Sequence, residues 1–164
     1  MKKKVLIVIL LLVGCSKKKT LFENISPKNS NVYFSNDIVE REGFNILENE
    51  FVYNGGGLGI GDFNNDGLQD LYFTGNMVDN SLYLNKGDFK FVDVSKIAHI
   101  RAENRWSSGV ALVDINNDGL LDIYSCATML NDPEKRKNLL YLNKGTNAED
   151  VPIFDEVAEA YGLD

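Results

Sequence analysis

The chain has 164 residues and a formal net charge of −7, and hydrophobic residues make up 44% of it. This length suits one domain or part of a larger one, and the composition excludes a disordered chain. The acidic balance argues against nucleic-acid binding, because phosphates require a basic protein surface.

Residues 1–15 are organised like a bacterial lipoprotein signal. Three lysines near the start carry positive charge, and the apolar run Val5–Val13 is too short to span a bilayer stably. The run ends in LVGC, which resembles a lipobox, so we expect lipidation of Cys15 and anchoring in the bacterial cell envelope. An ordinary secretory peptide or an uncleaved anchor is the alternative. Ser16 favours delivery to the outer membrane, and the lack of a following acidic run favours its periplasmic face.

Residues 16–50 form a predicted tether and a segment without repeats. The basic residues 17–19 fit either a solvated tether or contact with anionic lipid headgroups. Asn31–Ser35 is a strand candidate, and in a ring of blades such a strand can complete the last blade.

The rest of the chain divides into two repeats, residues 51–100 and 101–164. Aligning Asp62 with Asp114, 52 residues later, makes seven of nine loop positions identical. The hexapeptide LYLNKG also occurs twice, at 82–87 and 140–145. Internal repeats of this length are typical of propellers and arrays.

Each repeat contains four short predicted strands, followed in the second repeat by a short helical turn within 156–164. Four antiparallel strands per unit predict an all-β protein built from β-propeller blades, and the polar, proline-containing stretch 127–138 predicts a longer surface loop. Propellers have about four to eight blades, so two predict an incomplete ring whose other blades come from a longer chain or a partner. The predicted strands are 58–61, 71–74, 81–84 and 90–94 in the first repeat and 110–113, 123–127, 139–142 and 153–157 in the second.

The loop between the first two strands of each repeat has the spacing of a calcium-binding loop. Side chains with oxygen atoms occupy positions 1, 3, 5 and 9, position 6 is a glycine that can turn the chain sharply, and position 7 offers a backbone carbonyl. Ca²⁺ takes about six to eight oxygen ligands. We therefore predict two Ca²⁺ sites, formed by Asp62, Asn64, Asp66, Leu68 and Asp70 in the first loop and by Asp114, Asn116, Asp118, Leu120 and Asp122 in the second.

An EF-hand, a plain turn and a Mg²⁺ site fit these loops less well. An EF-hand needs a glutamate at position 12, where this chain has Phe73 and Ser125. An Asx-rich hairpin turn explains one such loop, but less readily two that keep every ligand position. Mg²⁺ prefers strict octahedral geometry with bound waters, so the crowded loop favours Ca²⁺.

Together these motifs resemble a known family. The stretch GDFNNDGLQDLYFTGN at 61–76, with YNGGG before it and LYLNKG after it, is similar to FG-GAP/VCBS-repeat lipoproteins of the ASPIC/UnbV, or cartilage acidic protein-like, group. The resemblance implies a calcium-stabilised, integrin-α-like β-propeller with the metal between the first two strands of a blade, and no established catalytic activity. Such propellers usually have about seven blades, so we expect this chain to be the N-terminal portion of a longer protein, with the product of a truncated gene or a partner in assembly as alternatives.

The sequence carries little sign of catalysis. The single histidine, His99, fits a turn, and no nucleophile motif or phosphate loop is present. Cys126 lies in an apolar run, so we predict that it is a small core residue. We predict that Trp106 either packs against neighbouring side chains or contacts a ligand. We therefore expect a non-catalytic module that binds proteins or glycans through loops such as Met129–Asn138. The alternative is an accessory or hydrolytic role in the use of envelope polysaccharides.

Overall fold

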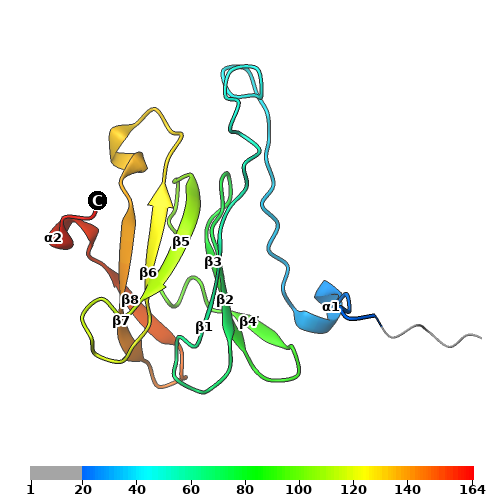
Figure 1. Ribbon diagram of the computed structural model, residues 1–164, viewed down its shortest axis with the longest axis vertical. Coiled ribbons are helices and arrows are strands. Elements are labelled where there is room, and N and C mark those ends of the chain that lie inside the picture. The colour runs from blue at the N-terminus through cyan, green and yellow to red at the C-terminus, as the bar shows by residue number, and fades with distance from the viewer. Residues whose placement is uncertain (1–19) are drawn as a thin grey trace, which may run out of the picture.

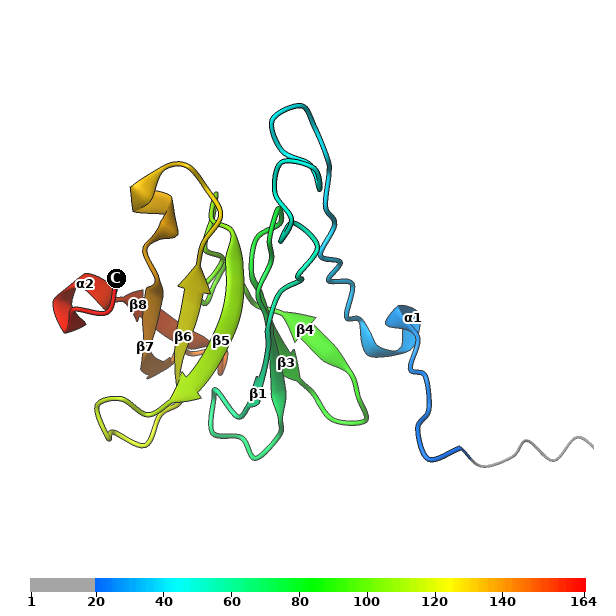
Figure 2. The same ribbon diagram turned by 45° about the horizontal axis from the view of Figure 1, so that its top comes forward.

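The computed structural model of the protein describes residues 20–164, which form two four-stranded antiparallel sheets (Figure 1). The all-β prediction with two propeller-type blades is confirmed, and the described residues do not close a ring (Figure 2). The lipoprotein signal with Cys15 lies outside the described residues. The first sheet contains β1 (Leu58–Gly61), β2 (Asp70–Phe73), β3 (Ser81–Asn85) and β4 (Phe91–Asp93), and the second contains β5 (Ser107–Val113), β6 (Asp122–Ala127), β7 (Leu139–Thr146) and β8 (Pro152–Glu156).

The helical elements are single turns. They are α1 (Pro27–Ser30), the 3-10 helix η2 (Pro133–Arg136) in the loop between β6 and β7, and α2 (Ala158–Tyr161) in the predicted C-terminal turn. Within residues 20–164, no helix has the length and apolar character needed to cross a bilayer.

Strands that are neighbours in the chain are also neighbours in each sheet. Their bounds agree with the predicted ones to within one residue, except for two longer strands. β5 begins at Ser107, which pairs with Ala127 of β6. A shift of register separates this pair from the regular pairing that starts at Val110. β7 continues through the NKG turn to Thr146, where a second shift of register separates two paired stretches.

The hydrophobic core lies between the two sheets. Phe63 of the loop after β1 packs edge to face on Phe154 of β8, with 6.2 Å between the ring centroids. The buried Tyr72 hydroxyl donates a hydrogen bond to the backbone carbonyl of Ile100 (3.3 Å), which lies in the connection between the sheets. The two repeats therefore share one core, whose buried members include Tyr72, Leu82, Leu84, Ile123, Tyr141 and Phe154.

β1 and β5 are in contact where the two sheets meet. Gly59 and Gly61 occupy the buried positions of β1, on the face turned to the second sheet. A Cβ atom on Gly59 would lie 3.0 Å from the Leu112 side chain, and one on Gly61 would overlap Leu121. Glycine at these positions therefore permits the close approach of the sheets.

The prediction that Asn31–Ser35 forms a strand is wrong, because this stretch pairs with no strand of the described residues. Residues 31–38 alternate between half-buried and exposed, as a strand does. Phe34 stacks on Phe73 of β2, with 4.8 Å between the ring centroids, and the Asn36 side chain donates a hydrogen bond to that of Asn76 (2.7 Å). The alternating pattern therefore reflects packing on side chains of the first sheet, without a ladder of backbone hydrogen bonds.

Three single-residue predictions can be compared with the structure. Trp106 is buried, with 5.2 Å between its ring centroid and that of Phe44, so the packing prediction is confirmed. His99 is exposed in a turn with a φ of 62°, as expected. The prediction of Cys126 as a core residue is wrong, because this free thiol is only half-buried in β6. It lies beside the exposed Gly109.

Candidate functional site: the two acidic loops

The loop between β1 and β2 binds its own backbone through its acidic side chains. The Asp62 carboxylate accepts hydrogen bonds from the N–H groups of Asp66 (3.1 Å) and Gly67 (2.7 Å). The Asp66 carboxylate accepts from the side-chain amide of Asn64 (3.0 Å) and from the N–H of Leu68 (2.8 Å). Gly67 has a φ of 86°, a conformation that glycine adopts without steric cost. The structure thus brings together the predicted ligands at positions 1, 3 and 5.

The loop between β5 and β6 repeats this network residue for residue. Asp114 accepts from the N–H groups of Asp118 (3.0 Å) and Gly119 (2.9 Å). Asp118 in turn accepts from the side-chain amide of Asn116 (2.8 Å) and from the N–H of Leu120 (2.9 Å). The order of residue types in the motif therefore dictates the local geometry.

The aspartate at position 9 has a different environment in both loops. Asp70 is fully buried, and its two oxygens accept from the N–H groups of Phe63 (3.0 Å) and Asn85 (2.8 Å). Asp122 is also fully buried and accepts in the same way from Ile115 (3.0 Å) and Asn143 (2.8 Å). Each of these carboxylates therefore joins the start of its acidic loop to the asparagine of the LYLNKG motif in the third strand.

Asn85 and Asn143 are the functional residues that the sequence analysis missed. The Asn85 side-chain amide donates to the carbonyl of Gln69 (2.9 Å), just before Asp70. The Asn143 amide donates to the carbonyl of Phe63 (2.9 Å), which links the second repeat to the first acidic loop. The signal was present, since both are the asparagine of the repeated LYLNKG, but that motif was interpreted only as a turn.

The residues of the first loop fit a hard cation in two respects. The side-chain carbonyl oxygen of Asn64 is buried and has no hydrogen-bond partner, so it is an acceptor that a cation could satisfy. Burial raises the pKa of Asp70 to about 6, although hydrogen bonds from Asn85 and Phe63 lower it, and the nearby Asp66 and Asp62 carboxylates raise it further. A bound cation would offset both the burial of this charge and the repulsion among the carboxylates.

The loops are not preformed cation cages. In residues 20–164, no three acidic, histidine or cysteine side chains converge in a metal-binding arrangement, because the carboxylates are turned to backbone N–H groups. A carboxylate oxygen has two lone pairs, so accepting one hydrogen bond leaves capacity for a metal. Ca²⁺ at either loop stays a prediction.

Comparison with known proteins gives a family match that includes both acidic loops, and two similar relatives. Residues 62–125, from the first ligand position to the middle of β6, match the family of the FG-GAP-like repeat. The chain is 36% identical over 72 residues to cartilage acidic protein 1 of Xenopus tropicalis, and 35% identical over 72 residues to that of Homo sapiens. These matches cover 43% of this chain but only 11% of each relative. The predicted resemblance is therefore confirmed as a similarity: residues 62–125 match the FG-GAP-like repeat, and part of the chain is similar to cartilage acidic protein 1.

Proposed function

We propose that the protein is a non-catalytic, calcium-stabilised β-propeller repeat module that binds a protein or glycan ligand in the bacterial cell envelope. The observation that carries the calcium part is the pair of loops with the same hydrogen bonds, which link the predicted ligand residues at positions 1, 3 and 5 within each loop. The match of residues 62–125 to the FG-GAP-like repeat supports a binding module rather than an enzyme.

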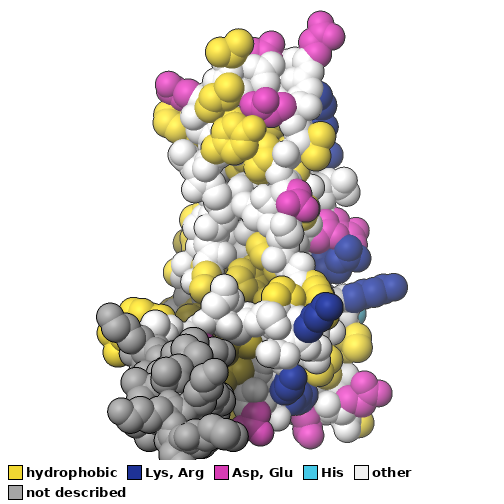
Figure 3. All heavy atoms as spheres, turned by 90° about the vertical axis from the view of Figure 1, so that its right-hand side faces the viewer, with side chains coloured by type: hydrophobic (Ala, Val, Ile, Leu, Met, Phe, Trp, Pro, Cys, Tyr) yellow, Lys and Arg dark blue, Asp and Glu magenta, His cyan; other side chains and the backbone are white. Residues whose placement is uncertain are grey.

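Further blades of the same kind are part of this proposal. Gly59 of β1 is buried against the second sheet, but the equivalent Ala111 of β5 is exposed, and so is Val113. On the other side of the pair, Leu58 and Ile60 of β1 are 50% and 54% exposed, and Figure 3 shows apolar side chains on that face. Apolar surface for a further blade therefore remains on both sides of the pair. Ala111 and Val113 replace the glycines of the existing interface, and Phe34 already packs on Phe73 beside Leu58.

Anchoring and location rest on the sequence. Lipidation of Cys15 would hold the blades at a membrane. Ser16 favours the outer membrane, and the lack of a following acidic run favours its periplasmic face. An extracytoplasmic location also suits weak calcium loops, because such modules bind Ca²⁺ with a Kd of about 10⁻⁴–10⁻³ M.

Thermal unfolding of the purified protein in Ca²⁺ and in chelator tests the calcium part. A ligand at ten times its Kd stabilises the folded state by about 1.4 kcal/mol per site, so two sites should raise the Tm by about 5–10 °C. Asp62→Asn combined with Asp114→Asn removes one charged ligand from each loop, and the Tm difference between Ca²⁺ and chelator should shrink by at least half. An equal shift with Mg²⁺ would contradict selectivity for Ca²⁺, and equal Tm values in Ca²⁺ and chelator would exclude the calcium role.

A further inference from the structure

A pocket of about 300 Å³ lies among loops at one end of the two sheets. These loops lie at the upper end of Figure 1, whereas both acidic loops lie at the lower end. The pocket is lined by the turn 41–44, the β2–β3 loop, the segment before β5 and the β6–β7 loop, which contains η2. Its volume is at the lower end of the range for small-molecule sites, which suits a monosaccharide.

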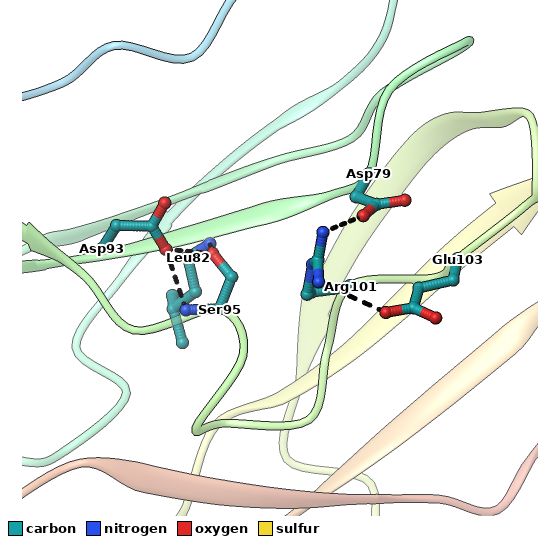
Figure 4. A network of polar contacts seen from close by, with 6 residues as sticks. All are labelled: Asp79, Leu82, Asp93, Ser95, Arg101 and Glu103. Atoms are coloured by element: carbon teal, nitrogen blue, oxygen red, sulfur yellow. Dashed lines mark hydrogen bonds and ion pairs between the residues drawn. The ribbon is translucent and has the colours of Figure 1, made fainter.

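The pocket is positively charged although the chain is acidic. Arg41, Arg105 and Lys135 line it, and its one acidic lining residue is Asp79. Asp79 is already paired with Arg101, which lies between Asp79 and Glu103 in Figure 4. Among residues 20–164, neither Arg41 nor Lys135 takes part in an ion pair. Arg41 and Lys135 therefore line the pocket without a carboxylate partner among the described residues.

Arg105 holds the β6–β7 loop beside the pocket. One guanidinium nitrogen donates to the backbone carbonyls of Glu134 (2.9 Å) and Lys137 (2.8 Å). The Glu134 carboxylate is paired with the Lys137 ammonium (3.0 Å), so it is not a counter-charge for the pocket cations. Arg105 is thus a positioning residue, and it leaves Lys135 on the pocket wall.

Part of the remaining wall is apolar, beside the polar Asn76 and Asn104. Phe44 packs on the buried Trp106, and the Arg41 guanidinium lies 5.6 Å from the centroid of the Phe44 ring. Two backbone hydrogen bonds close the turn between Arg41 and Phe44 (3.0 and 2.9 Å), so the cation and the ring are held together. Leu130 extends this apolar surface on the opposite loop.

We propose that this pocket binds a carboxylate-bearing sugar, whose carboxylate pairs with Arg41 and Lys135 and whose ring packs on Phe44 and Leu130. The planar arginine fork matches a carboxylate, and the apolar wall matches the C–H face of a pyranose. This inference deepens the proposed binding function and rests on it, naming acidic sugars as the ligand class.

Titration calorimetry of the purified protein in Ca²⁺ buffer, with glucuronate and glucose as probes, tests the ligand class. Glucuronate should bind at least about tenfold more tightly than glucose, because one charge-assisted contact corresponds to that factor or more. Added salt should weaken glucuronate binding, since the contacts are charged and partly exposed. Short oligomers of glucuronate test whether the natural ligand is part of a polysaccharide or a free sugar acid. If the oligomers bind more tightly than the monomer, the ligand is a residue of a polysaccharide. If only the monomer binds, the ligand is a free sugar acid.

Matched charge variants test the residues. Arg41→Gln combined with Lys135→Gln should weaken glucuronate binding by about tenfold or more. The control Lys86→Gln removes an exposed cation in the turn after β3 and should change the affinity less than twofold. Equal affinity for glucose and glucuronate, or equal effects of the pocket and control variants, would overturn the inference. The readout is separate from the calcium test, because failure of Ca²⁺ to raise the Tm leaves the charge selectivity of the pocket measurable.

Discussion

Asp70 and Asp122 differ in role from the other aspartates of the same motif. The aspartates at positions 1 and 5 stay on the surface loop, whereas these two are fully buried and each holds two backbone N–H groups. A buried donor without an acceptor costs about 1–3 kcal/mol. The ninth position is therefore structural whether or not a metal binds.

Asp122→Ala is expected to lower the free energy of unfolding by about 2–4 kcal/mol in chelator, because the N–H groups of Ile115 and Asn143 lose their acceptor. Urea unfolding followed by far-ultraviolet circular dichroism measures this loss. Asp118→Ala is the matched variant in the same loop. Since Asp118 is exposed, this change should cost less than about 1 kcal/mol in chelator and act mainly on the stabilisation by Ca²⁺. Equal losses for both variants in chelator would contradict separate roles for positions 5 and 9.

The strands of the two blades differ in which face is covered. In β1 the glycines are buried and Leu58 and Ile60 are exposed, whereas in β5 the side chains of Val110 and Leu112 pack on the core. The sequences also differ on this face, since β5 has Ala111 and Val113 where β1 has glycines. β1 has the second sheet packed on its glycine face, and β5 has no sheet there in residues 20–164.

Gly61→Val should destabilise the protein by about 1–3 kcal/mol, because the added atoms overlap Leu121 across the interface between the sheets. The substitution is otherwise suited to a strand, since the equivalent position of β5 is Val113. Thermal unfolding compares it with Gly109→Ala, whose Cβ would come no closer than 3.8 Å to a neighbouring side chain. The control should shift the unfolding free energy by less than about 1 kcal/mol. A harmless Gly61→Val would mean that the sheets do not pack as described.

The molecule as a whole has two partly apolar faces that no sheet covers in residues 20–164. The small-residue face consists of Ala111 and Val113, which occupy the positions equivalent to the glycines that receive Leu112. The opposite face carries Leu58 and Ile60. Such a head-to-tail relation between unlike faces permits association of copies when no further blade is supplied.

The purified 164-residue protein should therefore associate as its concentration rises, which light scattering detects. Ala111→Arg places a charge on the small-residue face and should shift association to at least about tenfold higher concentration. Ala148→Arg adds the same side chain on the exposed loop between β7 and β8 and should have no such effect. A protein that stays monomeric at all concentrations, or equal effects of the two variants, would argue against these faces as interfaces.

Much of this architecture was predictable because its signals are local. The alternation of apolar and polar residues located all eight strands, and the repeated loop and LYLNKG motifs indicated the two blades. The strand assigned to Asn31–Ser35 was wrong for the same reason: alternation reports a buried and an exposed side of the chain, and packing of Phe34 on Phe73 produces that pattern without strand pairing.

Residue order accounts for the hydrogen bonds among positions 1, 3 and 5 of the acidic loops, since these join residues at most five positions apart. Contacts distant in sequence needed the folded chain. Three features depend on contacts between sheets and loops, which no short-range sequence pattern encodes. They are the hydrogen bond between Asp70 and Asn85, the half-exposure of Cys126 and the position of Arg41 and Lys135 around one pocket.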